Sequence, residues 1–569
     1  MSSQFEGLPL LAILGLICGT FAGGLVVVFR LVIENVAFHW LPNASAENFE
    51  DLSRLDRFIL CAAGGLIVGV ILHFLNVKQR NVGVVHVLER LDYHQGRLPF
   101  SNAVIQFITA CLCLLSGQSV GREGPSVHLG ATAGSILGRS LRVPNNSVRV
   151  LIGCGVAAAI AAAFNTPLAG VIFAMEVVIM EYTVIGFTPV IIAAVSATTL
   201  TRLTFGDDIA LSIPDLNFNS LQELPMVALM GALIGCLAAA FIQLTLLINS
   251  VFIKQVIWIR TTIAGVITGL IAITLPQVMG TGYDTVDSIL LLQISTTTIV
   301  VLVIAKTITT AAAIGLGMPA GLIGPTLFIG ATAGGAIGLS IASVSTSTAG
   351  VAFYATLGMA AMMAATLQAP LAALIYLLEL TANQAIILPG MTAVITASLV
   401  TRVVFGKSSI YRHLMLVKGL DYRNSPLSKA LRRIGVASVM ERNIIQQQRF
   451  VTPVEAEALL QNEPRWILLT DEEDHRKNSL LPATDLARHL NEIGVQIQSE
   501  QDKQLDLFRI PAKRYNTAAI TIIATLQEAH EKMESEQCDL LFIQGAHGNS
   551  KQRIYGVITR EHIESSYRI

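Results

Sequence analysis

The chain has 569 residues, of which 53% are hydrophobic and only 14% are charged, and its formal net charge is −1. Soluble domains carry about 25% charged residues, so most of this chain is expected to lie in a lipid bilayer. A net charge near zero argues against a nucleic-acid partner, and the seven cysteines lack the spacing of a metal site.

Apolar segments follow one another from about residue 8 to residue 405. The clear ones are 8–33, 57–76, 102–117, 149–163, 187–203, 223–250, 256–275, 298–316, 349–364 and 385–405. The first has no basic flank ahead of it, which predicts a retained span rather than a cleaved leader. Shorter pieces broken by Gly and Pro lie between several of these segments, at 125–138, 167–180, 325–342 and 370–381. Because lipid cannot satisfy open backbone, broken helices favour a transport protein.

Two motifs occur twice, at nearly the same offset. GPSVHLGATAGSILG (124–138) matches GPTLFIGATAGGAIG (324–338), and NTPLAGVIFAME (165–176) matches QAPLAALIYLLE (368–379). Shared Pro and Gly positions do not follow from apolarity alone, so we predict a duplication with halves at roughly 57–205 and 223–405. Duplicated membrane halves typically meet at a substrate site near the midplane.

The Gly-Pro pairs at 124–125 and 324–325 predict helices that begin inside the membrane. A helix N-terminus offers free N–H groups and partial positive charge, so two such ends predict a site for an anionic substrate. Glu123 precedes the first of them and can occupy this site as a tethered competitor, which protonation would release. The alternative is that Arg122 and Glu123 only pair with each other in an interfacial loop.

These residues resemble the CLC family of chloride channels and chloride/proton exchangers. The resemblance rests on GREGP (121–125), GLIGP (321–325), AFNTPLAGVIFAMEV (163–177) and SIY (409–411), which match family motifs in the family's order. It covers roughly residues 10–415. It implies a homodimer with one pore per subunit, and small inorganic anions, chloride first, as the transported ions.

The resemblance implies that Glu123 is the gating glutamate of the pore. It assigns the central anion to backbone amides of the second motif and to a tyrosine hydroxyl, and the outer anion to amides of the first motif. The implied anion-binding positions are Arg122, Gly124, Leu322, Ile323, Tyr411 and Val82. No cofactor is expected in the membrane region.

Two positions depart from the family's pattern. The first pore motif of the family is usually Gly-Ser-Gly-Ile-Pro, whereas the matching stretch here is NVGVV (81–85), so Val82 removes one hydroxyl contact to the anion. Proton-coupled members often carry a glutamate just after the position of Glu176, where this chain has Val177. Valine cannot relay a proton, so a glutamate-gated, pH-sensitive channel is favoured. A chloride/proton antiporter without the usual inner glutamate is the alternative.

The composition changes after Phe405. Residues 407–433 form a basic linker, which predicts a cytoplasmic C-terminal region. In residues 434–569, strand-like runs such as WILL (466–469) and LLFI (540–543) alternate with amphipathic patterns and predict an α/β domain.

Three segments of this region resemble parts of CBS motifs. VASVMER (436–442) resembles the opening of the first copy, LLPATDL (480–486) would close that copy, and YGVITREHI (555–563) resembles the closing strand-turn-helix of the second. They imply one CBS pair, and such pairs can bind adenine nucleotides through a hydroxyl and an aspartate. The first copy has Asp485 but Pro482 at the hydroxyl position, and the second has Thr559 but His562 in place of the aspartate. Neither set is complete, and a dimer-stabilising domain without a ligand is the alternative.

The predicted fold is an all-α polytopic membrane domain with an inverted repeat at 1–406, a basic linker at 407–433 and a cytoplasmic α/β CBS pair at 434–569. Minimal loops favour a bacterial inner (plasma) membrane. The sequence contains no HExxH motif, P-loop or nucleophile elbow, so an enzyme is not predicted. A membrane-anchored CBS sensor is a further alternative.

Overall fold

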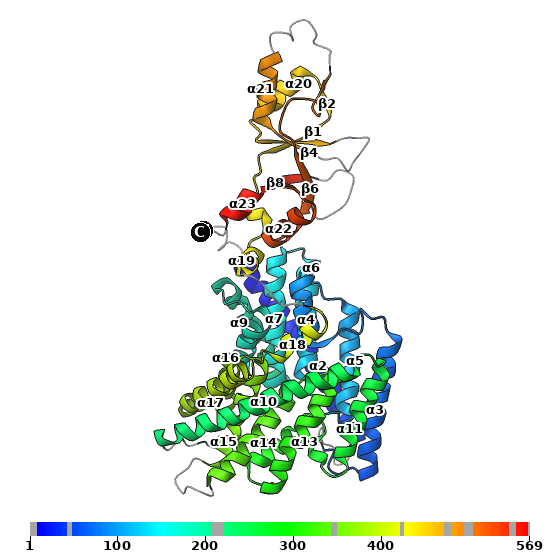
Figure 1. The fold of residues 1–569 in the computed structure, drawn as a ribbon, viewed down its shortest axis with the longest axis vertical. Helices are drawn as coiled ribbons and strands as arrows, with labels where there is room; N and C mark the ends of the chain where they lie inside the picture. Colours follow the sequence, from blue (N-terminus) through cyan, green and yellow to red (C-terminus); the bar gives the residue numbers. More distant parts are fainter. Residues whose placement is uncertain are drawn as a thin grey trace. The chain divides into compact units, whose positions relative to one another are not determined.

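The structure is a computed structural model. It describes residues 8–41, 48–207, 211, 216, 218, 220–342, 350–420, 426–470, 479–493, 504–545 and 553–566. The chain divides into two compact units, Met1–Ser140 with Val148–Tyr422, and Leu141–Ser147 with Arg423–Ile569. The first unit is helical, and the second combines helices and strands (Figure 1).

Apolar helices make up the first unit. They are α2 (Leu8–Trp40), α3 (Arg54–Phe74), α4 (Gly83–Tyr93), α5 (Phe100–Leu115), α6 (Glu123–Ser140), α7 (Asn145–Phe164), α8 (Pro167–Phe173), α9 (Val184–Phe205), α10 (Leu224–Phe252), α11 (Ile257–Ala272), α12 (Tyr283–Leu290), α13 (Thr296–Gly315), α14 (Ile323–Ala342), α15 (Val351–Leu367), α16 (Pro370–Thr381), α17 (Ile387–Leu399) and α18 (Ile410–Val417). Short 3₁₀ or π turns flank several of them: η2 (Ala174–Ile179), η3 (Leu221–Glu223), η4 (Pro276–Val278), η5 (Gln384–Ile386) and η6 (Val400–Val404).

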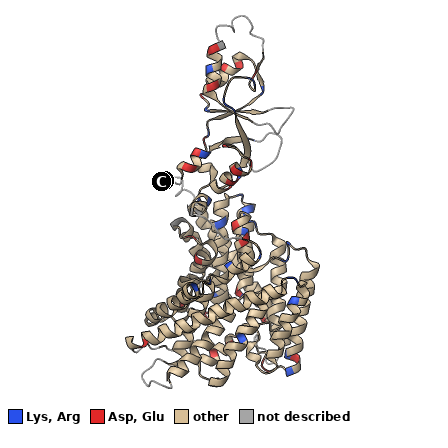
Figure 2. Ribbon diagram, in the orientation of Figure 1, with Lys and Arg blue, Asp and Glu red and all other residues tan. Residues whose placement is uncertain are grey.

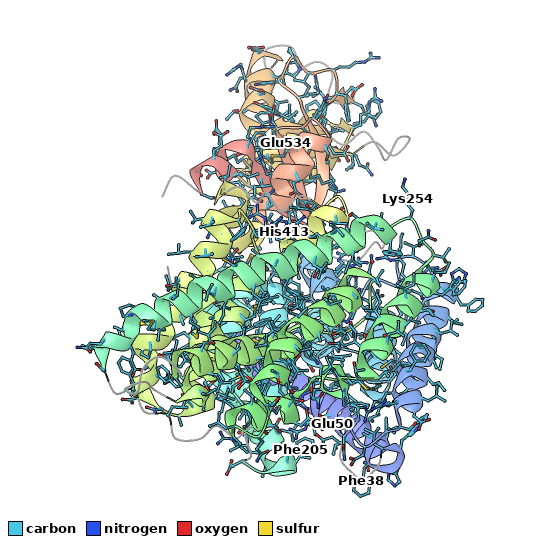
Figure 3. All side chains as sticks on the ribbon, turned by 60° about the horizontal axis from the view of Figure 1, so that its bottom comes forward. Phe38, Glu50, Phe205, Lys254, His413 and Glu534 are labelled. Atoms are coloured by element: carbon cyan, nitrogen blue, oxygen red, sulfur yellow. The ribbon has the colours of Figure 1, made fainter. Side chains whose placement is uncertain are left out.

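Eight of the described helices are long and apolar enough to cross a membrane. Charged side chains are sparse over this unit (Figure 2), and two that Figure 3 labels, Glu50 and Lys254, lie in the connections before α3 and after α10. An apolar span needs about 20 residues to cross the hydrocarbon core, which these helices supply. The chain is therefore an integral membrane protein, as its composition predicted.

The two halves use the same close helix contact. A Cβ on Gly130 of α6 would lie 2.1 Å from the carbonyl oxygen of Gly155 in α7, and one on Gly330 of α14 would lie 2.3 Å from that of Gly358 in α15. Only glycine lets the backbones approach this closely. The repeated sequence motif at 124–138 and 324–338 therefore corresponds to a repeated packing contact.

The halves meet through two loops, called here the Gly-Pro loops, which lead into the Gly-Pro pairs at 124–125 and 324–325. The loops form an antiparallel bridge. The N–H of Gly121 donates to the carbonyl of Gly321 at 2.7 Å, and the N–H of Gly321 donates to the carbonyl of Gly121 at 2.7 Å. An antiparallel pairing of equivalent residues means that the two loops run in opposite directions. The predicted fold class, a helical membrane domain with an inverted repeat followed by an α/β region, is confirmed.

A pair of glutamates links the halves a second time. Glu176, in η2, accepts the N–H groups of Leu371 and Ala372 at 3.2 and 2.7 Å, in the first turn of α16. Glu379, its repeat partner in α16, accepts two N–H groups from the first turn of α8 at 2.8 and 2.7 Å. Each carboxylate thus caps a helix of the other half, where free N–H groups and the helix dipole favour negative charge.

The second unit is built on a six-stranded sheet of order β1-β3-β4-β6-β7-β8. Its strands are β1 (Ile444–Gln448), β3 (Trp466–Thr470), β4 (Ser479–Pro482), β6 (Tyr515–Thr521), β7 (Leu540–Gln544) and β8 (Ile554–Thr559), and β2 (Phe450–Val451) pairs with β5 (Leu505–Asp506). Its helices are α19 (Pro426–Arg433), α20 (Pro453–Leu460), α21 (Ala483–Ile493), α22 (Leu526–Ser535) and α23 (Arg560–Ser565), with the 3₁₀ turn η7 (Val436–Ser438). The runs predicted as strands at 466–469 and 540–543 lie in β3 and β7.

The sheet contains two copies of one β-α-β-β-α unit. In the first copy β1 runs parallel to β3, and β3 antiparallel to β4, with α20 and α21 as its helices. In the second copy β6 runs parallel to β7, and β7 antiparallel to β8, with α22 and α23. The copies join at the sheet centre, where β4 pairs antiparallel with β6.

The segment 436–442, predicted to open the first copy, contacts the second. The Val436 N–H donates to the Ala524 carbonyl at 2.9 Å. Glu441 and Val557 of β8 exchange two backbone hydrogen bonds of 2.9 and 2.8 Å. Val436 is fully buried in the same hydrophobic cluster as residues of α22 and β8. The chain therefore enters this unit through the core of its C-terminal copy.

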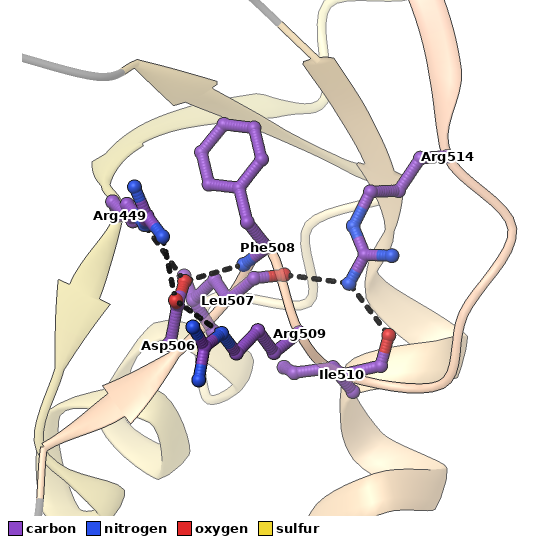
Figure 4. Close-up of polar contacts among 7 residues, drawn as sticks. All are labelled: Arg449, Asp506, Leu507, Phe508, Arg509, Ile510 and Arg514. Carbon is purple, nitrogen blue, oxygen red and sulfur yellow. Dashed lines mark hydrogen bonds and ion pairs between the residues drawn. The ribbon is translucent and has the colours of Figure 1, made fainter.

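Asp506 is the centre of a polar cluster beside β2 and β5 (Figure 4). Its carboxylate accepts two bonds from the Arg449 guanidinium, at 3.0 and 2.9 Å, and one from the Phe508 N–H at 3.0 Å. Arg509 lies 3.5 Å from the same carboxylate. The hydrogen bonds from Arg449, together with the Phe508 N–H and the nearby charges, lower the pKa of Asp506.

We expect Asp506→Asn to destabilise this region at neutral pH. A carboxylate whose folded pKa lies below its unfolded value of about 3.9 contributes stability above that pH, and loses it as the pH falls through the folded pKa. The loss should be about 1 kcal/mol at pH 7, because solvent screens part of the pair, and should vanish in strong acid. Hydrogen exchange of residues 444–451 and 504–521 in the full-length protein measures it.

Asp539→Asn is the matched control for this prediction. Asp539 pairs with Arg560 at 3.3 Å, and their side chains are 71% and 42% exposed, so little stability should be lost. Equal protection in the two variants at pH 7 would contradict the role given to Asp506.

Candidate anion site

The Glu123 carboxylate lies at the start of a helix from the other half of the chain. Glu123 is the first residue of α6 and is fully buried. Its Oε2 accepts the Gly324 N–H at 3.2 Å, in the first turn of α14, and its Oε1 accepts the Tyr283 hydroxyl at 2.5 Å. A carboxyl oxygen therefore already occupies a helix N-terminus, the kind of position that the sequence predicted for an anion.

The backbone brings the two helix starts together because both loops carry glycine at their contact. A Cβ on Gly124 would lie 2.6 Å from the Cα of Gly321, and one on Gly321 would lie 2.5 Å from the N of Gly124. Real Cβ atoms do not approach backbone this closely, so a larger residue at either position would separate the loops.

Arg122 contacts its surroundings from the same loop. Its Nη2 donates to the Ala163 carbonyl at 3.3 Å, and its Cζ lies 5.5 Å from the centre of the Tyr283 ring. The guanidinium thus stands over the ring whose hydroxyl holds Glu123. This places a fixed positive charge beside the predicted outer site.

Leu322 and Ile323, the predicted contacts of the central anion, lie at the start of α14. Both are buried, 2% and 1% exposed, and Ile323 begins α14. N–H groups in a first helical turn have no acceptor within their own helix. These amides are therefore suited to bind an anion.

Tyr411 and Val177 line one cavity of about 280 Å³ in the first unit. Its lining also includes Glu176, Arg402 and Arg412, so two cationic side chains face this space. Tyr411 is 4% exposed, and its hydroxyl has no hydrogen-bond partner among the described residues. The structure thus brings the predicted pore tyrosine and the predicted proton-path position together.

The loop ahead of Tyr411 is fixed by a histidine of the same helix. His413, labelled in Figure 3, lies two residues beyond Tyr411 in α18, and its Nε2 accepts the Ser408 N–H at 3.1 Å. This bond ties the start of α18 to its own N-terminal loop.

Val82 immediately precedes α4 and makes no side-chain hydrogen bond to that helix. Its neighbour Gly83 has φ +80°, a conformation that favours glycine. A Cβ on Gly83 would lie 3.9 Å from Oε1 of Gln106, whose Nε2 donates to the Pro319 carbonyl at 2.6 Å. Gln106 therefore lies beside the start of α4 and is hydrogen-bonded to the segment just before the second pore motif.

His128 forms a buried pair with His86 of α4. Nδ1 of His86 lies 2.9 Å from Nε2 of His128, and Nε of Arg90 donates to Nε2 of His86 at 3.0 Å. Because an arginine only donates, Nε2 of His86 must accept, and a neutral His86 then donates from Nδ1 to His128. The pair joins α4 to α6 through a chain of hydrogen bonds with a fixed direction.

Sequence reasoning missed Tyr283 and Gln106. Tyr283 is 160 residues from Glu123 in the chain and starts the short helix α12. No motif surrounds either residue. Gln106 is a polar residue in the apolar helix α5, where such a residue is usually only a packing residue, and Tyr283 stands in the short polar stretch YDTVDS. A signal for them would have required knowing which helices meet at the Gly-Pro loops.

The two predicted nucleotide contacts serve local structure. The Thr559 hydroxyl caps α23 by accepting the His562 N–H at 3.1 Å. Asp485 Oδ2 accepts the Lys513 N–H at 3.4 Å, and Asp485 lies 3.8 Å from Arg488. The proposed roles of Asp485 and Thr559 in binding a nucleotide stay predictions.

Comparison with known proteins identifies the family of this membrane unit. A family model described as voltage gated chloride channel matches residues 64–402, more than half of the chain. A putative chloride channel protein ClcB-like from Ralstonia nicotianae is 32% identical over 414 residues, which are 71% of this chain and 95% of that protein. An H(+)/Cl(−) exchange transporter ClcA from Vibrio parahaemolyticus is 29% identical over 415 residues, 71% of this chain and 88% of that one. The chain belongs to the voltage-gated chloride channel (CLC) family.

Solved structures share the fold at lower identity. A slow cyanobacterial Cl−/H+ antiporter has a TM-score of 0.63 at 22% identity, and the match covers 73% of this chain and 99% of that one. A eukaryotic CLC transporter has a TM-score of 0.59 at 18% identity, and the match covers 97% of each chain. The second likeness extends over the C-terminal α/β unit as well as the membrane helices.

Proposed function

We propose that this protein conducts chloride across the membrane through a path that the Glu123 carboxylate closes. The observation that carries the proposal is the hydrogen bond between Glu123 Oε2 and the N–H of Gly324 at the start of α14. An anion bound at this helix end would meet the same N–H group and the same positive end of the helix dipole. Carboxylate and chloride would therefore compete for one site.

Protonation of Glu123 is the opening step in this proposal. A neutral carboxyl group loses its attraction to the helix dipole and accepts the Tyr283 and Gly324 hydrogen bonds less strongly. The side chain then leaves the site, and chloride replaces it. Flux should consequently rise as the pH falls.

We favour a passive channel over an exchanger. Val177 lines the same cavity as Tyr411 and has no group that binds a proton, and Glu176 beside it is engaged as a helix cap. Relatives carry names of both kinds, including a voltage-gated ClC-type chloride channel from Citrobacter koseri that is 30% identical over 371 residues. A chloride/proton antiporter is the competing proposal.

We further propose a homodimer in a bacterial inner membrane, with its basic linker and C-terminal unit in the cytoplasm. The duplicated β-α-β-β-α unit supports the assignment of residues 434–569 to a CBS pair. An adenine nucleotide is the candidate ligand of that pair. The sensor alternative would make this unit the functional part and the membrane unit only its anchor.

Liposomes with a chloride gradient test the function. The purified protein is reconstituted, and chloride efflux and internal pH are recorded together. Chloride efflux without coupled proton movement supports the channel. Uphill proton movement driven by chloride would make the protein an exchanger. An absence of anion flux at every pH would contradict chloride transport itself and favour the sensor.

A further inference from the structure

A second buried tyrosine lies near the gating glutamate. Tyr376, in α16, is 2% exposed, and its hydroxyl has no hydrogen-bond partner among the described residues. Tyrosine has a single polar atom, which usually finds a partner when it is buried. The position of this hydroxyl therefore requires an explanation.

The aromatic rings around Phe164 place Tyr376 beside the gate. The Tyr376 ring packs edge-on against Phe164 with centroids 5.2 Å apart, and Phe164 packs edge-on against Tyr283 at 6.5 Å. Tyr283 in turn donates its hydroxyl to Glu123. The Tyr376 hydroxyl is also within electrostatic range of the charges of Glu123 and Arg122. Both halves of the chain contribute to this cluster.

A buried hydroxyl without a partner is costly. Leaving a buried donor unsatisfied costs about 1–3 kcal/mol. Phenylalanine would have filled the same volume without that cost. Beside Glu123 and Arg122, an anion that visits the site would supply the missing partner of this hydroxyl.

We propose that the Tyr376 hydroxyl donates a hydrogen bond to the permeating anion, a halide, next to Glu123. The proposal rests on the chloride path proposed above and adds a ligand to it. The Tyr411 hydroxyl, in α18, is likewise buried and has no hydrogen-bond partner among the described residues. Two tyrosine donors, from α16 and α18, then supplement the backbone amides.

Tyr376→Phe tests the proposal because it removes only the hydroxyl. Chloride is titrated calorimetrically into detergent-solubilised, chloride-free protein. We expect chloride to bind at least about 10-fold more weakly, as for the loss of a hydrogen bond to a charged partner. Tyr354→Phe is the matched control, because Tyr354 is also fully buried with an unpartnered hydroxyl but lies in α15, within range of Glu223. The control should bind chloride as the unmodified protein does.

Wild-type affinity in Tyr376→Phe would overturn the proposal and leave a water molecule as the partner of this hydroxyl. The same loss in Tyr354→Phe would also overturn it, because the effect would then be general. If Tyr376→Phe does not fold, bromide-soaked crystals of the unmodified protein test the proposal instead. An anomalous peak beside the Tyr376 hydroxyl would support it, and the absence of such a peak would overturn it. If the unmodified protein transports chloride and only the Tyr376 result is negative, the proposed function stands.

Discussion

Replacing Glu123 by alanine is expected to produce chloride flux that no longer depends on pH. In the unmodified protein the flux should rise by up to about 10-fold for each unit of falling pH while the carboxylate is mostly ionised, because one proton opens the path. The variant has no carboxylate to occupy the start of α14, so its flux should be high at every pH. Chloride efflux from liposomes between pH 4.5 and 7.5 measures both curves.

The control for this experiment is Glu223→Gln. Glu223 is also buried, at 5% exposure, but it belongs to η3, just before α10, and not to the segments around Gly121 and Gly321. Its removal should leave the pH dependence unchanged. A steep pH response that persists in Glu123→Ala would remove Glu123 from the gating role.

Tyr283→Phe is expected to move the pH of half-maximal flux upward by about 1–2 units. The Tyr283 hydroxyl donates to Glu123 Oε1 at 2.5 Å and so favours the ionised, closed state. A hydrogen bond to a charged group contributes about 1.5–3 kcal/mol, and about 1.4 kcal/mol corresponds to one pH unit. Without this hydrogen bond the closed state is less stable, and the same efflux assay would record the upward shift of the midpoint.

Tyr354→Phe serves again as the control, since it deletes a buried hydroxyl in α15. Its midpoint should match that of the unmodified protein. An unchanged midpoint in Tyr283→Phe would mean that the hydroxyl does not stabilise the closed state. A downward shift would mean that it stabilises the open one.

Much of the membrane fold could be predicted from the sequence because its causes are local. Proline favours a helix start and glycine permits a close approach, so GREGP and GLIGP predicted that helices begin at these motifs. In the structure the helices begin at Glu123 and Ile323, one residue before each Gly-Pro pair. The second occurrence of these motifs also predicted that the membrane domain consists of two repeated halves. The exact partners of Glu123 could not be read in the same way, because an apolar sequence does not specify which helix faces which.

The residues that the sequence analysis missed were missed because their contacts depend on how distant helices pack. Tyr283, Tyr376 and Gln106 act through contacts with segments far away in the chain, and none belongs to a motif. Gln106 and Tyr376 were visible as polar residues in apolar helices, but the sequence did not show which segment each one contacts. Only the fold shows that Tyr283 and Tyr376 flank one phenylalanine near Glu123.

In the C-terminal unit, strands could be predicted and their connections could not. Short apolar runs bounded by polar residues indicated β3 and β7 correctly. The segment 436–442 precedes the first copy in sequence but packs in the core of the second. Sequence order predicted that this segment packs with the first copy, which follows it directly. In the structure Val436 is instead buried among residues of α22 and β8, which belong to the second copy.

Bromide-soaked crystals of Glu123→Gln test most directly whether the carboxylate and the anion share a site. The account predicts an anomalous peak within hydrogen-bonding distance of the Gly324 N–H in the variant, and none there in the unmodified protein at neutral pH. A peak at that position in both proteins would contradict the competition, and so would bromide bound elsewhere along the path with none at Gly324 in the variant.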